Sequence, residues 1–273
     1  MHVYKVLPNL AKKRHMSMWH KALESQWSPR DLDWDAAGKV RSAALRRDLA
    51  RVLTPILMGE QAALYSITTL VQILGQEAEV ESQFYLVSML LDEARHTELF
   101  TRYYGRLGET PMPIRRFPAG YLFQSKVMAR EPSEWLVGSL VSEVLAKFSL
   151  EAFRQLDCDP LLTELTGRIL EDEARHLGFN HVFLEDRSWN RFKGEVPHAV
   201  DAEAWVEHLK ARLDDVLHSV PPMLEGLDSE LRGVGMDPGE LFERLTEDTH
   251  RRLAKSLDSG ARRAREAEPE GVA

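Results

Sequence analysis

Residues 92–96 read DEARH, and residues 172–176 read DEARH again, letter for letter. The two copies are offset by 80 residues (176 − 96 = 80). Apolar residues around both copies recur at spacings of three and four, which predicts that each copy lies in a long amphipathic helix. Each copy therefore places a glutamate and a histidine one turn apart on the same helix face. These pairs are Glu93 with His96 and Glu173 with His176.

A helix with one glutamate on its apolar face precedes each motif along the chain. Glu60 shares a stripe with Leu57 and Leu64, and Glu143 shares one with Leu140. The separations from these glutamates to the motif glutamates are similar, 33 residues (93 − 60) and 30 residues (173 − 143). Two antiparallel hairpins of that length bring all these side chains to one level of a helical bundle.

Four carboxylates and two imidazoles pointing into one core predict a metal site. Burying the carboxylates without compensation would cost several kcal/mol for each ion, and a pair of cations removes that cost. Carboxylate and imidazole ligands suit iron or manganese. We therefore expect two iron ions, or a manganese and an iron ion, in an all-α, ferritin-like four-helix bundle with additional flanking helices. The predicted ligands are Glu60, Glu93, His96, Glu143, Glu173 and His176.

The alternative interpretation is that the motifs are solvated charges on a helical repeat. A single Glu-x-x-His has almost no predictive value, because exposed glutamates are common on helices. Two copies, each preceded by a core-facing glutamate at a matching distance, favour the metal site. The single glutamates of the upstream helices are then expected either to bridge the two ions or to cap them.

The other charged letters of the motif predict outer partners for the ligands. A metal-bound histidine usually donates its second ring N–H to a carboxylate or a carbonyl. Each motif aspartate lies four residues before its histidine and could accept that bond, in its own motif or across to the opposite histidine. The motif arginines would then pair with the aspartates. Surface salt bridges between helix neighbours are the alternative. These residues are Asp92, Arg95, Asp172 and Arg175.

Helical periodicity dominates the rest of the chain. Four segments are expected: an irregular arm over 1–35, the bundle over 36–190, accessory helices over 191–258 and a disordered tail over 259–273. The bundle helices are expected over about 36–51, from Thr54-Pro55 to Gly75 as a second helix or a continuation of the first, over 77–106, over 132–156 and over 160–187. Residues 109–131 contain three prolines and predict a connector, and accessory helices are expected over 201–218 and 238–257.

Composition excludes several classes of protein. The 273 residues are enough for one large domain, and the formal net charge of −8 argues against a nucleic-acid binder. The sequence has no run of about 18 apolar residues, so no membrane span is expected. The single cysteine, Cys158, and the absence of an apolar leader are consistent with the cytoplasm.

The ligand pattern over residues 40–187 resembles that of the di-iron carboxylate oxygenases and oxidases. Members of this superfamily include bacterial multicomponent monooxygenase hydroxylases, the small subunit of ribonucleotide reductase, and ligand-binding oxidases related to that subunit. The Asp-Glu-x-Arg-His motifs are most similar to those of the monooxygenases and ligand-binding oxidases. The resemblance is specific for the metal site and implies little about the substrate.

Three positions depart from particular members of the superfamily. Phe100 stands where the reductase subunit has its radical tyrosine, and no tyrosine follows Tyr121. Ile169 stands where some N-oxygenases have a seventh ligand. Lys147 stands where monooxygenases often have threonine, and its side chain is expected either to contact substrate or oxygen or to extend out of the core.

The resemblance implies an oxidoreductase that activates O2 and hydroxylates, N-oxygenates or desaturates a small, largely apolar organic molecule. It also implies an external electron donor, and we expect a homodimer. A ferroxidase or iron-storage protein is the main alternative, and a ligand-binding Mn/Fe oxidase is another. Candidate pocket residues are Leu64, Phe100, Leu140, Lys147 and Phe179.

Overall fold

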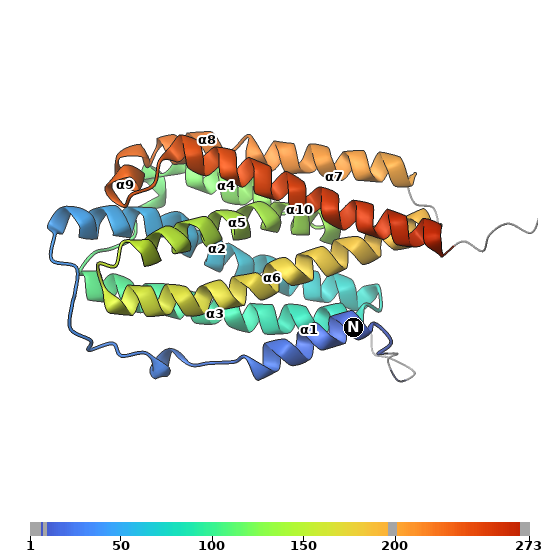
Figure 1. Ribbon diagram of the computed structural model, residues 1–273, viewed down its shortest axis with the longest axis horizontal. Coiled ribbons are helices and arrows are strands. Elements are labelled where there is room, and N and C mark those ends of the chain that lie inside the picture. The colour runs from blue at the N-terminus through green and yellow to red at the C-terminus, as the bar shows by residue number, and fades with distance from the viewer. Residues whose placement is uncertain (1–6, 8–9, 196–200, 268–273) are drawn as a thin grey trace, which may run out of the picture.

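The computed structural model describes residue 7, residues 10–195 and residues 201–267, and this part of the chain contains helices and no strand. Figure 1 shows the helices lying side by side along one long axis. Their bounds are α1 Lys13–Glu24, α2 Ala43–Gln76, α3 Val80–Leu107, α4 Pro118–Val127, α5 Pro132–Gln155, α6 Pro160–Phe192, α7 Ala202–Leu217, α8 Val220–Glu225, α9 Asp228–Gly233 and α10 Pro238–Glu266, with short 3-10 turns at η1 Pro29–Asp31 and η2 Ile114–Arg116.

Four long helices, α2, α3, α5 and α6, form the central bundle. Sequence neighbours pack as hairpins, α2 on α3 and α5 on α6, and the two hairpins meet where α3 contacts α6 and α2 contacts α5. The predicted all-α bundle with flanking helices is therefore confirmed. No helix in the described residues is both long and apolar enough to span a bilayer.

The flanking helices cover opposite sides of the bundle. In Figure 1, α1 lies along α3 on the lower side, while α10, α7 and α8 lie along the upper side. The helix α10 packs mainly on α6, and α9 packs on α2. The bundle is thus enclosed by elements that come from both ends of the chain.

The sequence left open whether residues 36–75 form two helices or one continuous helix, and the structure shows one continuous helix. α2 runs from Ala43 to Gln76 with Pro55 inside it, so Thr54 is not a helix cap. The Thr54 hydroxyl donates to the Ala50 carbonyl at 2.9 Å, and the same oxygen accepts a backbone N–H from Met112 at 3.0 Å. Thr54 therefore forms its hydrogen bonds from within the helix, whereas the sequence had also allowed it to be a helix cap.

Three segments are more helical than the sequence indicated. The prediction of an irregular arm was wrong over Lys13–Glu24, where α1 buries His15 and Ala22. The connector at 109–131 contains the ten-residue helix α4. Residues 259–266, expected in a disordered tail, continue α10, while 268–273 lie outside the described residues. Each of these helices is stabilised by packing on the bundle, which local propensity does not reveal.

Two glycines permit close approach between neighbouring helices. A Cβ on Gly260 of α10 would lie 2.3 Å from the Glu185 carbonyl oxygen of α6. A Cβ on Gly138 of α5 would lie 2.2 Å from the Val127 carbonyl oxygen at the end of α4. Backbone atoms cannot rotate away as a side chain can, so both contacts require glycine.

Gly260→Ala is expected to destabilise the protein by about 1–3 kcal/mol, because the added methyl group must push α10 away from α6. For a protein of this size, each kcal/mol lowers Tm by roughly 2–4 °C, measurable by calorimetry. The matched control is Gly105→Ala, since a Cβ at this exposed helical position meets nothing within 4 Å. The control should leave Tm unchanged or raise it slightly. Equal losses in both variants would contradict the packing argument.

Candidate metal centre

The six predicted ligands come together inside the central bundle. Glu60 comes from α2, Glu93 and His96 from α3, Glu143 from α5, and Glu173 and His176 from α6. All six are buried, and none has a relative exposure above 9%. The solvated-charge interpretation does not fit this burial.

The Nδ1 atom of His96 faces three carboxylates. It lies 3.5 Å from Glu60 Oε2, 3.5 Å from Glu173 Oε1 and 3.7 Å from Glu93 Oε2. Although it is buried, this nitrogen has no hydrogen-bond partner. A buried imidazole nitrogen surrounded by carboxylate oxygens is an arrangement that a bound cation, in place of a proton, would satisfy.

The Nδ1 atom of His176 faces a corresponding set. It lies 3.3 Å from Glu173 Oε2, 3.5 Å from Glu93 Oε1 and 3.6 Å from Glu143 Oε2. The two motif glutamates thus each place one oxygen near each histidine, whereas Glu60 lies near His96 only and Glu143 near His176 only. Of the two expected roles for the single glutamates, this arrangement favours capping, and the motif glutamates are the residues that could serve both ions.

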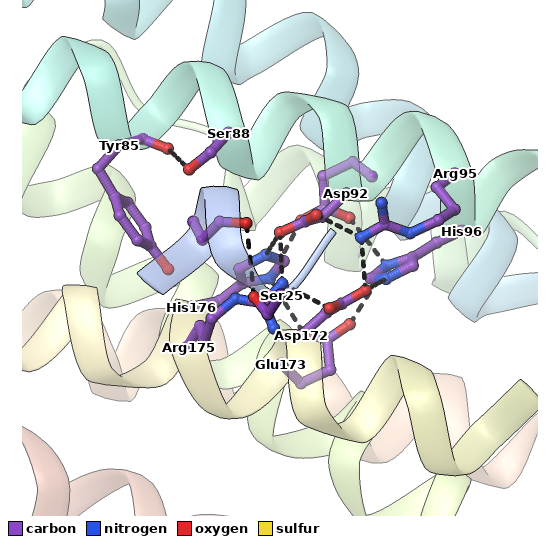
Figure 2. A network of polar contacts seen from close by, with 12 residues as sticks. Ser25, Tyr85, Ser88, Asp92, Arg95, His96, Asp172, Glu173, Arg175 and His176 are labelled. Carbon is purple, nitrogen blue, oxygen red and sulfur yellow. Dashed lines mark hydrogen bonds and ion pairs between the residues drawn. The ribbon is translucent and has the colours of Figure 1, made fainter. Parts of the chain in front are cut away.

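The motif aspartates contact the histidines of the opposite motif. Asp172 Oδ2 lies 3.1 Å from His96 Nε2, and Asp92 Oδ2 lies 3.3 Å from His176 Nε2 (Figure 2). An ionised carboxylate only accepts hydrogen bonds, so in both imidazoles Nε2 carries the proton. Nδ1 is then the nitrogen that faces the glutamates, and it can bind a metal once it has lost its own proton.

The motif arginines join the two aspartates. Arg95 donates to Asp92 and, at 2.8 Å, to Asp172, while Arg175 donates to Asp92 at 3.0 Å and to Asp172 at 2.5 Å. Both aspartates have a relative exposure of 1%. The four charges therefore form a buried, crossed network between α3 and α6, and the alternative of surface salt bridges does not fit (Figure 2).

Two residues of this network were absent from the sequence prediction. The Trp27 indole N–H donates to Asp172 Oδ2 at 3.1 Å, and the Gln26 amide donates to Asp92 Oδ1 at 3.2 Å. The Arg95 guanidinium also lies over the Trp27 ring, 4.7 Å from its centroid. The chain just after α1 thus covers the network. No spacing rule connects these residues to the motifs, because the contacts span 66 and 145 residues.

The electrostatics of the cluster follow from burial. Burial raises the pKa of Glu93 and of Glu173, and the neighbouring Glu60 and Glu143 carboxylates respectively reinforce the increase. Burial opposes ionisation of Asp172, but its hydrogen bond to His96 and its contact with Arg95 outweigh burial and lower its pKa. Burial likewise opposes protonation of His96, yet the surrounding carboxylates raise its pKa well above the ordinary value.

These properties fit a pair of bound cations. The protons that Glu93, Glu173 and the histidines retain in the free protein occupy the positions a metal would take. Two groups of residues meet the spacing of a metal site, Glu60 with Glu93 and His96, and Glu93 with Glu143 and His176. Oxygen and imidazole donors without thiolates suit iron or manganese.

A cavity of about 70 Å³ lies directly beside the four glutamates. All four line it, together with mainly apolar residues of α2, α4, α5, α8, α9 and α10. The wall opposite the glutamates is built by α4 and the accessory helices, for example by Phe123, Leu224 and Leu231. Segments outside the four-helix core therefore form a large part of the lining of the space next to the candidate metal site.

The structure places the residues that were predicted to form one substrate pocket in different surroundings. Leu140 and Lys147 line a different cleft of about 630 Å³ between α5, α6 and α10. Leu64, Phe100 and Phe179 line neither cavity; Phe100 is fully buried, and Phe179 stacks on the Tyr85 ring at 4.2 Å. For Lys147, the structure fits the alternative of a side chain extending outward, with Nζ 3.8 Å from Glu151.

Comparison with known proteins indicates the same fold. No protein-family profile matches the chain. A variant "R2-like ligand-binding oxidase" with aerobically reconstituted Mn/Fe cofactor aligns with a TM-score of 0.67 at 16% identity, over 93% of this chain and 99% of that chain. A second such oxidase, also with aerobically reconstituted Mn/Fe cofactor, aligns with a TM-score of 0.66 at 15% identity, over 93% and 98%. The chain therefore has the fold of these ferritin-like oxidases, and the predicted resemblance is confirmed at that level.

Asp172→Ala is expected to weaken metal binding roughly 10- to 100-fold, the usual effect of losing a partner that orients a metal-bound histidine. The loss frees the His96 ring and leaves Arg95 with one buried carboxylate fewer. Competition with a chelator measures the affinity. Asp258→Ala, at an exposed position on α10, is the matched control. Wild-type affinity in Asp172→Ala would mean that the crossed contact does not support the site.

The metal-free protein should become less stable as pH rises from about 6 to about 8. Glu93, Glu173, His96 and His176 all have raised pKa values in the folded state, so the folded protein binds more protons than the unfolded chain. Their contribution to stability is complete below the unfolded pKa values and is lost as pH rises toward the folded ones.

Thermal unfolding of chelator-treated protein at several pH values measures this dependence. Glu173→Gln removes one of the titrating groups and should flatten the curve. In metal-loaded protein the trend should reverse, because ligands must lose protons to bind. A metal-free Tm that rises between the two pH values would contradict the pKa directions.

Proposed function

We propose that the chain is a non-haem oxidoreductase that uses two metal ions to activate O2 and oxidise a small, largely apolar organic molecule. One observation carries the proposal: the four buried glutamates that surround the histidine nitrogens also form one wall of an otherwise mainly apolar cavity. A molecule in that cavity would lie against the metal ligands. This juxtaposition of a donor set and a mainly apolar cavity is typical of a catalytic centre.

In this proposal Glu60 and His96 would hold one ion, and Glu143 and His176 would hold the other. Glu93 and Glu173 serve both, since each has an oxygen near each histidine. A redox-active ion pair would supply electrons for the reduction of O2, with an external donor restoring them. The similar oxidases carry Mn/Fe cofactors, which favours a mixed manganese–iron pair as a second candidate beside two irons.

The protein's own residues would perform three tasks around the ions. The crossed aspartates keep the protons on Nε2 and so hold both imidazoles in the metal-binding form. Arg95 and Arg175 fix the aspartates in turn. The apolar walls from α4, α8 and α9 would hold an apolar guest next to the ligands.

The ferroxidase alternative requires a different environment. Iron that enters as substrate and leaves as product needs a polar route to the surface. The cavity that all four glutamates line is instead lined mainly by residues such as Val52, Ile56 and Leu145, whereas the polar cleft beside Lys147 reaches only one ligand, Glu173. This lining supports ions that stay in place as a cofactor. Cytoplasmic location and a homodimer remain predictions.

Anaerobic loading should give close to two metal ions per chain, and O2 should then oxidise the protein once without loss of iron. Metal analysis before and after exposure tests the stoichiometry, and mass spectrometry with labelled O2 tests for oxygen transfer to an organic molecule. Loading with manganese and iron together, followed by metal analysis, separates the two cofactor candidates. Glu143→Ala should lower occupancy, because one ion loses its only single-glutamate ligand.

Glu151→Ala on the same helix is the matched control, since Glu151 is only partly buried and lies outside the ligand cluster. It should keep wild-type metal content. A protein that takes up no metal under anaerobic loading would refute the central assignment. Continuous oxidation of many irons per chain, with a ferric core forming, would replace the oxygenase proposal by the ferroxidase.

A further inference from the structure

The outer face of the α2–α3 hairpin is exposed but carries no charge. Over residues 61–76 the exposed side chains of α2 are all uncharged, and over residues 80–97 those of α3 are all apolar. Three of them are large: Tyr65 is 68% exposed, Leu91 53% and Val87 47%. We name this surface the hairpin face, and its exposed residues are Gln61, Tyr65, Thr68, Gln72 and Gln76 on α2, and Val87, Leu91 and Ala94 on α3.

The residues of the two helices form one continuous strip. Glu60 of α2 and Glu93 of α3 lie at the same level of the bundle, since both approach His96 Nδ1. The two helices are antiparallel neighbours, so a residue five positions after Glu60 lies close to the level of a residue five positions before Glu93. Tyr65 is therefore beside Val87, and the exposed apolar side chains of α2 and α3 adjoin one another.

Other helices stop short of the hairpin face. The short helix α9 reaches only the first part of α2, where Glu230 pairs with Arg51. The helix α1 packs along α3 and also contacts α6, with Trp19 lying 5.7 Å from the Phe84 ring. The α5–α6 hairpin, in contrast, has the long helix α10 packed along it. The middle of the α2–α3 hairpin therefore remains open on its outer side.

The helix α10 shows what a solvated face of this protein looks like. Every exposed side chain of α10 over residues 243–263 is charged or is a histidine. Charged residues make up 29% of the whole chain, so their absence from a long exposed strip is a departure from its composition. Depletion of charge together with exposed aromatic and aliphatic side chains is typical of a surface that is buried in an assembly.

The absence of charge favours a second copy of this chain as the occupant. In a twofold contact the same patch is present on both sides, so charges of one sign on it tend to face their own kind. The chain has a formal net charge of −8, and two copies repel each other except through an uncharged face. The glutamine and threonine side chains of the hairpin face both donate and accept hydrogen bonds, so they can pair with the same residues of another copy.

A membrane surface is a poorer match. A helix that lies on a bilayer usually displays lysine and arginine beside its apolar residues, because these cations bind anionic lipid head groups. The exposed residues of the hairpin face include neither. The chemistry of the face therefore fits another protein surface of the same composition.

The size of the hairpin face is sufficient for a dimer of moderate stability. The strip is roughly 24 Å long and about 20 Å wide, given the rise of 1.5 Å per residue and the width of two helices. Two such strips bury on the order of 1,000 Å² in total, which is near the lower limit of a specific interface. We therefore expect a dimer that dissociates on dilution.

We propose that the hairpin face binds the hairpin face of a second copy and forms a twofold dimer. The inference goes beyond the oxidase assignment and does not depend on it. The same two helices carry Glu60, Glu93 and His96 on their inner sides. The contact between copies thus lies directly behind one half of each candidate metal centre.

Analytical ultracentrifugation of the full chain over a range of concentrations tests the assembly. The wild type should form a dimer at high concentration, and Leu91→Lys should raise its Kd at least about 100-fold, because it places a charge on a face that meets its own copy. Leu122→Lys is the matched control, since Leu122 lies on α4, outside the hairpin face, and is 51% exposed. The control should dimerise as the wild type does. Tyr65→Lys replaces Leu91→Lys if that variant fails to fold.

Thiol alkylation locates the contact. In a Cys158→Ser background, Val87→Cys should react more slowly at concentrations where the dimer forms, whereas Leu122→Cys should react at the same rate throughout. A wild type that is monomeric at every concentration would overturn the proposal, and one that instead floats with lipid vesicles would assign the face to a membrane. A dimer that persists in both Leu91→Lys and Tyr65→Lys, or that protects Leu122→Cys and not Val87→Cys, would place the contact elsewhere and refute it.

Discussion

The fold is organised around the electrostatic cost of placing four glutamates in the centre of a helical bundle. Each carboxylate repels the others at short range, and each is at least nine-tenths buried. Protons or cations must balance them, and the raised pKa values of Glu93 and Glu173 express that requirement in the protein alone. This one constraint explains the arrangement of the histidines, the crossed aspartates and the arginines. The remaining helices cover the cluster that these residues form.

The arrangement has approximate twofold symmetry at its centre and none around it. Each motif contributes the same four functional residues, and the contacts of His96 are repeated by His176 with the roles of the two halves exchanged. The surroundings differ: Trp27 and Gln26 cover the aspartates on one side, while α4, α8 and α9 enclose the cavity on the other. A symmetric ligand set can thus serve an asymmetric reaction, because the cavity that all four glutamates line lies on one side of them.

The ligand cluster could be predicted because it depends on the spacing of neighbouring residues along each helix. A Glu-x-x-His pair on a helix face, repeated 80 residues later, is sufficient to place Glu93, His96, Glu173 and His176 together. The cavity could not be predicted, since its walls depend on how α4 and the C-terminal helices pack on the bundle. Leu64, Phe100 and Phe179 satisfied the periodicity of a core face, and periodicity does not distinguish a residue that lines a space from one that fills it. Trp27 was unpredictable for a similar reason: its partner Asp172 is 145 residues away.

The crossed aspartates mean that the repeat is not a pair of independent modules. His96 belongs to the first half of the chain and takes its orienting carboxylate from the second, and His176 does the reverse. Neither half-chain therefore contains a complete histidine–carboxylate pair, and neither would have been a competent metal binder by itself. If the two halves descend from one duplicated hairpin, the ancestral unit must have worked as a pair of identical chains. The present connector through α4 would then be a later addition that turned an intermolecular site into an intramolecular one.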